Sequence, residues 1–152
     1  MSIELRPLSP EESGMTFPVF KTYMKPVIEA AFGWDEAFQY HGFTANLQPE
    51  WFSWVVSCGH QAGLVCYRQK AESLHIHLLV TFSSQQRQGV ASRVITLLKG
   101  QACRQNLSLT LSCIKNNHPA LHLYRKLGFE VQEEDEHFYN LICYDPCPIH
   151  IQ

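Results

Sequence analysis

The sequence predicts an α/β (α+β) fold, with a mixed sheet and helices in a single domain. Strand-like and helix-like segments alternate along the chain, which is the pattern of a sheet covered by helices. A chain of 152 residues suits one hydrophobic core. The sequence shows no repeats, linkers or low-complexity stretches, so we expect one domain over residues 1–152.

The first half of the chain is expected to hold a strand, two helices and a hairpin. Pro26 lies inside the longer helical segment and, because proline has no amide N–H, we expect it to kink or split that helix. Strand-forming residues flank the turn "CGHQAG", which indicates a hairpin. The expected elements are a strand at 3–8, helices at 16–32 and 33–43, and strands at 51–58 and 63–68.

The second half mixes the periodicities of strands and helices. Val90, Val94 and Leu98 recur at helical spacing, which predicts an amphipathic helix. The run "LSLTLSC" alternates strictly and predicts a half-buried strand. Pro119 suits the first turn of a helix that Gly128 ends. The expected elements are strands at 73–82, 107–113, 129–134 and 137–144, and helices at 88–104 and 116–129.

The composition argues against nucleic-acid and membrane partners. The formal net charge is −2 and the pI is about 6.4. No run of Lys or Arg exceeds two residues, so the sequence has no basic patch for phosphate backbones or anionic lipids. No apolar stretch approaches the roughly 20 residues that span a bilayer, and the polar N-terminus does not resemble a secretory signal. We therefore expect a cytoplasmic protein.

The six cysteines lie at irregular spacings and mostly inside apolar segments. We expect them to be reduced and mostly in the core, in keeping with a cytoplasmic protein. Cys143 and Cys147 are close enough in sequence to pair or to bind a metal. No second close pair accompanies them, so the core interpretation is preferred and no metal site is expected.

Residues 86–91, "QRQGVA", connect a predicted strand to a predicted helix. Amide N–H groups at a helix start have no partners within the helix and carry about half a positive charge from its dipole. Such a turn suits phosphate or pyrophosphate. Gly89 and the small Ala91 permit close approach of a ligand, and Arg87 adds charge. The alternative is a plain strand-to-helix loop, since the Lys of a Walker A loop and two glycines of a dinucleotide-binding loop are missing.

His75 and His77 lie in an apolar strand just before this turn. Alternation places both of them, with Leu79 and Thr81, on one face of the strand. Two residues of strand span about 6.6 Å, so one ordered water can bridge the two rings. A free imidazole has a pKa of about 6.5, which suits a base at neutral pH. The alternative is that the rings line the solvated or half-buried side of the sheet. A zinc site would need a third ligand, and the sequence nominates none.

Two motifs in this context resemble the signatures of the GNAT superfamily of N-acetyltransferases. The turn matches the acetyl-CoA-binding pattern R/Q-x-x-G-x-G/A, and the pattern N-x-x-A-x-x-x-Y-x-x-x-G-F follows at the expected distance. The resemblance is closest over residues 73–144, and residues 23–43 resemble one bacterial subgroup of the superfamily. The second pattern comprises Asn117, Ala120, Tyr124, Gly128 and Phe129.

The resemblance implies a GNAT fold, with a mixed, mostly antiparallel central sheet flanked by helices, and acetyl-CoA as the cofactor. The pantetheine arm would pair with the exposed backbone of Leu79, Val80 and Thr81, like an added strand. Asn117 would hold the other side of that arm. Ser83 stands where many members have proline, which affects the stiffness of the loop. The coenzyme A pyrophosphate would rest on the turn formed by Gln86, Arg87, Gln88, Gly89, Val90, Ala91 and Ser92.

The resemblance also implies direct transfer of an acetyl group to an amine, without a covalent acyl-enzyme. Tyr124 would point at the coenzyme A sulfur and donate a proton to the departing thiolate. The strand that carries His75 and His77 is similar to the corresponding strand of serotonin N-acetyltransferase, where an H-x-H-x-L pair relays the amine proton through water. The two histidines would then form the base here, with a carboxylate such as Glu29 or Glu72 as the alternative.

The sequence leaves open the identity of the amine, the length of the acyl chain and the oligomeric state, including a homodimer. Trp34 and Phe38 lie in the segment that caps the acceptor side in the superfamily. Their rings could stack on an apolar amine or grip a cation, with packing in the core of a short helix as the alternative. A small molecule or an exposed protein amine would fit as the acceptor. A non-catalytic acyl-CoA-binding or sensor domain is the rival function.

Overall fold

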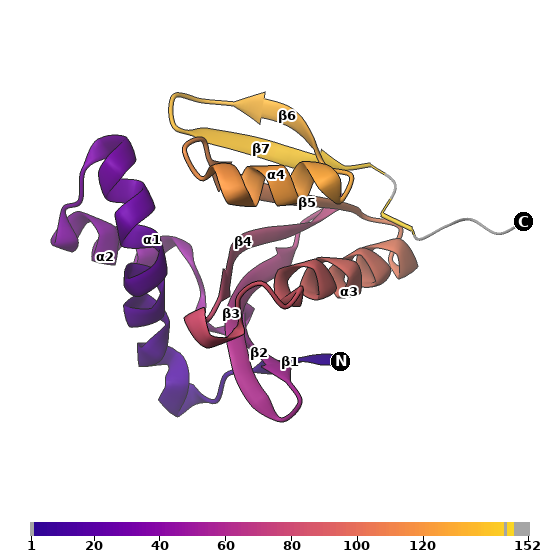
Figure 1. Ribbon diagram of the computed structural model, residues 1–152, viewed down its shortest axis with the longest axis horizontal. Helices are drawn as coiled ribbons and strands as arrows, with labels where there is room; N and C mark the ends of the chain where they lie inside the picture. Colours follow the sequence, from indigo (N-terminus) through magenta and orange to yellow (C-terminus); the bar gives the residue numbers. More distant parts are fainter. Residues whose placement is uncertain (1, 145, 148–152) are drawn as a thin grey trace, which may run out of the picture.

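The computed structural model describes residues 2–144 and 146–147, which form one seven-stranded sheet with helices on both sides (Figure 1). The strands are β1 (Ile3–Pro7), β2 (Phe52–Ser57), β3 (His60–Gln69), β4 (Ser73–Thr81), β5 (Ser108–Ile114), β6 (Glu130–Glu134) and β7 (Phe138–Cys143). The helices are α1 (Thr16–Phe32), α2 (Glu36–Asn46), α3 (Val90–Arg104) and α4 (His118–Lys126), with 3₁₀ turns η1 (Pro10–Met15), η2 (Pro49–Trp51) and η3 (Ser83–Gln85).

The sheet has the order β1-β2-β3-β4-β5-β7-β6, and only β4 and β5 run parallel. The expectation of a mixed, mostly antiparallel sheet is therefore confirmed. The β4–β5 pairing begins where Ser73 faces Ser108 and ends where Ile76 faces Leu111. Beyond Ile76 the two strands separate, and one edge of β4 has no strand partner. We call this gap the β4–β5 opening.

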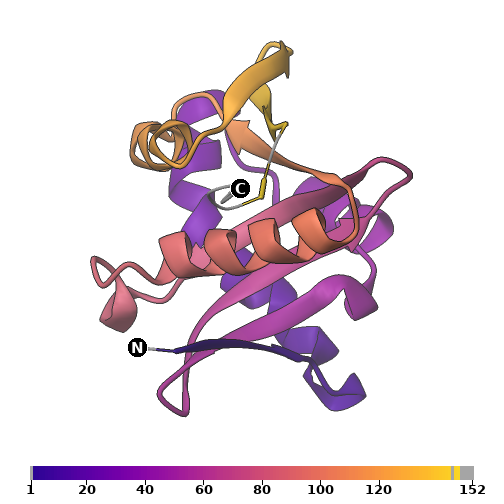
Figure 2. The ribbon, with the colours of Figure 1, turned by 90° about the vertical axis from the view of Figure 1, so that its right-hand side faces the viewer.

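Helices cover both faces of the sheet. α1 and α2 lie on one face, and α3 and α4 lie on the other (Figure 1, Figure 2). Val94, Ile95 and Leu98 of α3 are fully buried, as the amphipathic pattern predicts. Trp54 and Leu64 are fully buried in the second cluster, against which α1 packs. Burying one such side chain contributes about 1.5–3 kcal/mol, so the sheet holds both layers in place.

A β-bulge in β4 changes which side chains face which helices. Cys66 of β3 lies opposite Leu78, but the next residue, Tyr67, lies opposite Ile76. His77 is therefore an extra residue in β4. Ile76, before the bulge, packs into the core beneath α3, whereas Leu78, after it, packs into the cluster beneath α1.

The bulge corrects the expectation that four residues of this strand share a face. His75 and His77 do lie together, with ring centroids 4.6 Å apart. Leu79 instead packs against the core beneath α3, and Thr81 lines a cavity at the start of α3. One extra residue reverses the alternation of side chains, so the two-residue period of a strand does not predict which residues share a face across the bulge.

The expectation that Pro26 kinks or splits the first long helix is wrong as regards a break, because α1 runs unbroken from Thr16 to Phe32. A proline inside a helix removes one backbone hydrogen bond, but Phe17 and Phe20 of α1 pack against the buried cluster and outweigh that loss. The next helix begins at Glu36 rather than at residue 33, because the Asp35 carboxylate accepts a hydrogen bond from the amide of Phe38 (2.9 Å) and caps the helix there.

A disulfide corrects the expectation that all cysteines are reduced. Cys103, near the end of α3, is bonded to Cys147, and their Cα atoms are 4.8 Å apart. The two residues are separated by 44 positions in the sequence, so only the fold brings them together: β7 pairs with β5, which follows α3. Cys143, the partner of Cys147 that the sequence suggested, is buried and free, and Cys66 and Cys113 are buried and free as expected.

We expect Gly63→Ala to destabilise the sheet. A methyl group at Gly63 of β3 would collide with the backbone oxygen of Val80 on β4, which should cost about 1–3 kcal/mol. Gly42→Ala is the control, because a methyl group there meets nothing within 4 Å and should stabilise α2 by about 0.5–1 kcal/mol. Urea unfolding of the three proteins measures both effects. A Gly63→Ala midpoint equal to that of the parent would contradict the prediction.

Candidate functional site

A cavity of about 210 Å³ lies in the β4–β5 opening. We call it the central cavity. It receives side chains from α1 on one face of the sheet and from α4 on the other, and its α1 wall is apolar. None of the described residues that line it is Asp, Glu, Lys or Arg. The lining includes Phe20, Met24, Ile28, Phe32, Gln39, His77, Leu79, Ser112, Cys113, Asn117, Tyr124 and Phe138.

His75 lies behind this cavity with both ring nitrogens engaged. Its Nδ1 atom is 2.7 Å from the hydroxyl of Thr110, and its Nε2 atom is 3.4 Å from the hydroxyl of Ser112. Ser112 in turn donates to Oδ1 of Asn140 (3.3 Å). His75 is only 6% exposed. It can therefore exchange a proton only through its hydroxyl partners.

His77 is the histidine that lines the central cavity. Its ring meets that of His75 edge to face, at 72°, so the rings touch directly and need no water between them. The His77 ring also stacks on the indole of Trp51, with an angle of 11° between the ring planes and 5.4 Å between the ring centroids. Its Nε2 atom is buried and has no hydrogen-bond partner among the described residues. Of the pair, His77 is thus the one with an uncommitted ring nitrogen.

The structure also corrects the expectation that these imidazoles titrate near neutral pH. Burial, with the nearby His77, Lys70 and Arg68, lowers the pKa of His75 to about 3. Burial, with Lys70 and Arg68, lowers the pKa of His77 to about 4. A buried imidazole between cations resists a second positive charge. Both rings are therefore neutral at pH 7.

Tyr124 and Cys113 line the same cavity in their protonated forms. Burial raises the pKa of Tyr124 above its ordinary value of 10.0, and proximity to Cys113 adds to the rise. Burial also raises the pKa of the Cys113 thiol to about 11. At neutral pH the phenol can donate a proton, whereas the thiol is a poor nucleophile because the thiolate is the reactive form.

The turn before α3 has the geometry of an anion site. Gly89 is the N-cap of α3 in the left-handed region, at φ 77°, and Arg93 donates the first helical hydrogen bond to its carbonyl (3.1 Å). The amides of Val90, Ala91 and Ser92 therefore have no acceptor within the helix. The turn lines a cavity of about 220 Å³ with Thr81, Gln86, Arg87 and Leu123.

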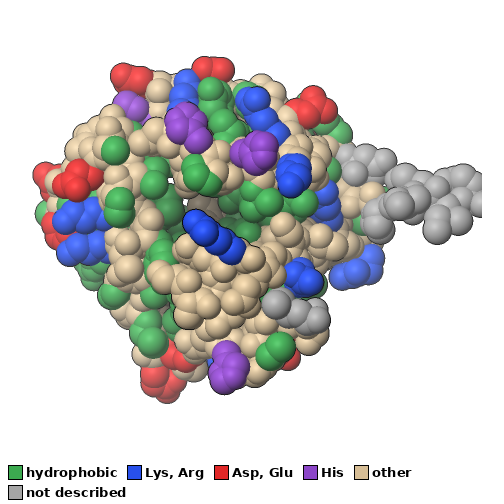
Figure 3. All heavy atoms as spheres, viewed as in Figure 1, with side chains coloured by type: hydrophobic (Ala, Val, Ile, Leu, Met, Phe, Trp, Pro, Cys, Tyr) green, Lys and Arg blue, Asp and Glu red, His purple; other side chains and the backbone are tan. Residues whose placement is uncertain are grey.

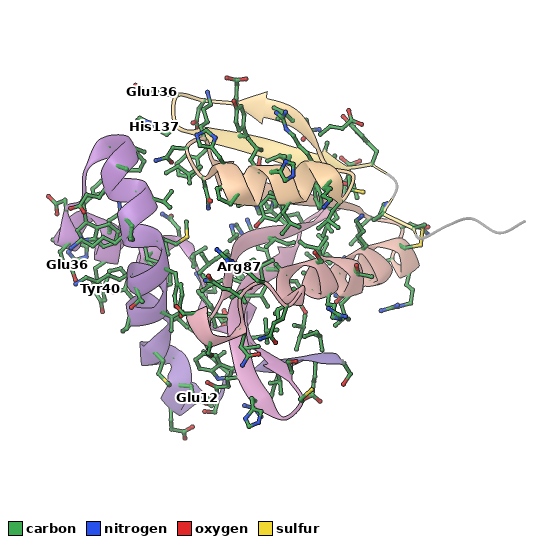
Figure 4. All side chains as sticks on the ribbon, in the orientation of Figure 1. Glu12, Glu36, Tyr40, Arg87, Glu136 and His137 are labelled. Carbon is green, nitrogen blue, oxygen red and sulfur yellow. A yellow bond between two sulfur atoms is a disulfide. The ribbon has the colours of Figure 1, made fainter. Side chains whose placement is uncertain are left out.

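Side chains around this turn contribute unequally. Val90 is only 2% exposed and belongs to the core, so only its backbone can meet a ligand. Arg87 lies at the centre of one face of the molecule (Figure 4), and the space-filling view of the same face shows a hollow there (Figure 3). Arg93 donates from Nη1 to the carbonyl of Gln88 (3.2 Å) and stiffens the turn.

The free edge of β4 continues from this turn to the central cavity. The amide of Phe82 donates to Ala62 on β3 (2.8 Å), and backbone groups alternate in direction along a strand. Leu79 and Thr81 therefore direct their backbone groups into the β4–β5 opening, and Val80 directs its groups toward β3. Within the opening, the Thr81 carbonyl already accepts a hydrogen bond from Nε2 of Gln86 (3.0 Å).

Two hydrogen bonds connect α1 to the loops on either side of the opening. The Tyr23 hydroxyl accepts from the amide of Ser83 (2.9 Å), which a proline at that position could not provide. Asn116, in the turn before α4, donates from Nδ2 to the carbonyl of Val27 (3.0 Å). The wall formed by α1 is therefore fixed at two points.

Some site residues predicted from the sequence meet in the central cavity and others do not. His77, Leu79, Asn117 and Tyr124 line it together. Trp34 and Phe38 lie outside it: Trp34 donates from Nε1 to Glu36 (2.9 Å), and Phe38 is 69% exposed. Sequence patterns did not indicate the residues of α1, α2 and β7 that line the cavity or the residues that contact the histidines. These are Phe20, Met24, Phe32, Gln39, Trp51, Thr110, Ser112 and Phe138.

Two kinds of feature are absent from the residues that the structure describes. In residues 2–144 and 146–147, no three His, Cys, Asp or Glu side chains gather closely enough to hold a metal ion. Over the same residues, no helix combines the length and apolar character that crossing a bilayer requires.

Comparison with protein families gives one match that covers most of the chain. Residues 17–129 match the acetyltransferase (GNAT) family. That range contains the central cavity's walls on α1, β4, β5 and α4, and the turn before α3. No curated protein sequence matches the chain.

Solved structures share the architecture at low sequence identity. PaiA N-acetyltransferase from Thermoplasma acidophilum, in complex with coenzyme A, gives a TM-score of 0.69 at 17% identity and covers 93% of this chain and 98% of that chain. An N-acetyltransferase from Staphylococcus aureus Mu50 gives a TM-score of 0.66 at 16% identity and covers 91% of this chain and 99% of that chain. Arabidopsis thaliana Naa50, in complex with the bisubstrate analogue CoA-Ac-MVNAL, gives a TM-score of 0.61 at 16% identity and covers 93% of this chain and 98% of that chain. At these identities the likeness establishes the fold.

We expect the protein to lose stability as the pH falls from neutral to about 4. In the unfolded state His75 and His77 bind protons below about pH 6.5, whereas their folded pKa values are about 3 and about 4. In this window the unfolded state binds more protons, so the free energy of unfolding decreases as the pH falls. Urea unfolding across the window measures the slope.

The double variant His75→Gln/His77→Gln should show a shallower slope than the parent. His60→Gln, which removes an exposed histidine at the start of β3, is the matched control and should keep the parent's slope. Equal slopes for the parent and the double variant would mean that neither histidine is held neutral by the fold.

Proposed function

Because the chain belongs to the acetyltransferase (GNAT) family and is an acyltransferase, we propose that it transfers the acetyl group of acetyl-CoA directly to the nitrogen of an amine. The observation that carries this proposal is the β4–β5 opening. It joins a turn with free amides, suited to an anion, at one end to an uncharged cavity with a protonated phenol and a neutral imidazole at the other.

The cofactor fits the opening in one direction. The pyrophosphate would accept hydrogen bonds from the amides that precede Arg93, with the Arg87 side chain nearby. The pantetheine arm would follow the free edge of β4, where Leu79 has no strand partner on the side of β5. Asn117 and Tyr124 would then meet the thioester end in the central cavity. The coenzyme A complex of PaiA and the bisubstrate complex of Naa50 support this choice of ligand.

The reaction forms one bond and breaks one. The amine nitrogen attacks the thioester carbonyl, the new N–C bond forms, and the C–S bond breaks as coenzyme A leaves. The proton that the nitrogen loses balances the proton that the sulfur gains. Tyr124 suits the donation to sulfur because its raised pKa keeps the hydroxyl protonated.

The histidine pair suits the removal of the amine proton. His77 faces the cavity with a neutral ring. The ring of His75 packs edge to face against it and is itself held by the hydroxyls of Thr110 and Ser112. The same dry surroundings that lower the pKa of His77 also lower the pKa of an amine bound beside it. The pKa values of the base and of the acceptor amine are therefore both lowered, so the proton can still pass from the amine to His77.

The acceptor is proposed to be an amine with an apolar neighbouring part, either a small molecule or an exposed protein amine. The α1 wall offers Phe20, Met24 and Phe32 to such a group, and no described charged side chain lines the cavity. No cysteine needs to carry the acetyl group, because the thiol of Cys113 stays protonated. Transfer is thus direct.

We expect Gly89→Trp to weaken coenzyme A binding by tenfold or more, which is about 1.4 kcal/mol. The indole would occupy the space in front of the free amides, where a Cβ already comes within 2.7 Å of the Arg93 guanidinium. Gly59→Trp is the matched control, because Gly59 has nearly the same φ of 79° but open space around it and no part in the turn. Isothermal titration calorimetry on both folded variants decides: equal affinities would rule out this turn as the binding site.

We expect the parent to release free thiol from acetyl-CoA only when an amine is added, and Tyr124→Phe to lower that rate about 10²-fold with little change in acetyl-CoA affinity. The substitution removes one hydroxyl and keeps the ring. Tyr67→Phe removes a half-buried hydroxyl outside the cavity and should leave the rate unchanged. Binding without amine-dependent thiol release, across a panel of amines, would identify a non-catalytic acyl-CoA-binding domain instead.

A further inference from the structure

Trp51 contacts both a cation and the histidine of the central cavity. It ends the η2 turn, and its indole lies nearly parallel to the His77 ring, at 11° and 5.4 Å between centroids. The guanidinium carbon of Arg68, on β3, lies 4.6 Å from the centroid of the same indole. The aromatic ring thus lies against both the imidazole and a permanent positive charge.

Arg68 has no carboxylate partner among the described residues. Strand pairing places it opposite His75, and its Nε atom is buried without a hydrogen-bond acceptor. Glu50 lines the same surface cavity as Arg68 and Trp51 but forms no ion pair with it. The indole therefore holds the guanidinium near the histidines, and no described carboxylate lies within ion-pair distance of it.

We propose that Trp51 and Arg68 are positioning residues for the acceptor base: together they hold the His77 imidazole in one orientation and in its neutral form. This inference rests on the proposed function, in which His77 accepts the amine proton. Trp51 contributes by covering one face of the ring, which excludes water and restricts rotation of the ring. Arg68 contributes by its charge, because a like charge nearby disfavours the imidazolium form.

The other titratable groups around His77 are compatible with this assignment. His75 is a neutral, buried neighbour, and Lys70 in the β3–β4 turn adds a second positive field. The described residues of α1 and α2 bring no charged side chain to the cavity. The remaining neighbours, protonated because burial raises their pKa values, are Cys66, Cys113 and Tyr124.

Matched pairs of variants separate the two contributions. Trp51→Leu removes the flat ring, and Trp51→Phe keeps one. Arg68→Met removes the charge, and Arg68→Lys keeps it. Arg6→Met removes a cation from β1, which β2 and β3 separate from β4, and serves as the control for loss of one positive charge.

The measurement is the NMR titration of the His77 imidazole, assigned by the loss of its signals in His77→Gln. We expect Trp51→Leu and Arg68→Met each to raise the pKa of His77 by about one unit. Trp51→Phe, Arg68→Lys and Arg6→Met should leave it near the parent's value. If Trp51→Leu does not fold, Arg68→Met and Trp51→Phe still carry the test. An unmoved pKa in Arg68→Met, with Trp51→Leu unmoved or unfolded, would overturn the inference.

The pH profile of kcat/KM distinguishes failure of this inference from failure of the proposed base. If the acid limb moves upward together with the His77 pKa, both hold. If the pKa of His77 rises while the acid limb stays in place, Trp51 and Arg68 control the ring but His77 is not the base. That outcome would overturn their role as positioning residues for catalysis.

Discussion

The separation of β4 from β5 after Ile76 is the constraint on which the rest of the structure depends. A parallel pair that continued to the end of β4 would bond both edges of the strand and leave no space between the sheet's two halves. Because the pairing stops, the β4 backbone keeps one free edge, and side chains from both faces of the sheet meet in the gap. The fold thereby places a free strand edge and a cavity in the middle of the sheet without exposing the core.

The bulge at His77 complements this separation. Without the extra residue, the alternation that points Leu78 beneath α1 would point it toward α3 instead. The bulge keeps the histidine pair on one side while it changes the side that Leu79 faces. A single inserted residue therefore leaves the two histidines on one face of the sheet and directs Leu79 to the other. Bulges at functional positions often re-aim side chains in this way.

Local patterns predicted much of the fold and part of the site. The apolar spacing from Val90 to Leu98 and the turn residue Gly89 predicted α3 and the glycine turn at its start, because these depend on neighbours in sequence. The bulge was not predictable, because it depends on how β3 pairs with β4. For the same reason no local pattern indicated that Thr110 contacts His75 or that Cys103 is bonded to Cys147. The expected titration near neutral pH failed because burial, a property of the whole fold, determines it.

The two hydrogen bonds of α1, at Tyr23 and Val27, hold this helix at a fixed distance from the loops on either side of the β4–β5 opening. One ends on Ser83, just ahead of the turn that leads into α3, and the other ends on Asn116, next to Asn117. Widening the opening by swinging α1 outward would break both, and each is worth about 0.5–1.5 kcal/mol. The two hydrogen bonds therefore hold the width of the opening between α1 and these loops constant. If the proposed acceptor enters here, a branched or bulky group next to its nitrogen would have to break these hydrogen bonds before it reached the central cavity.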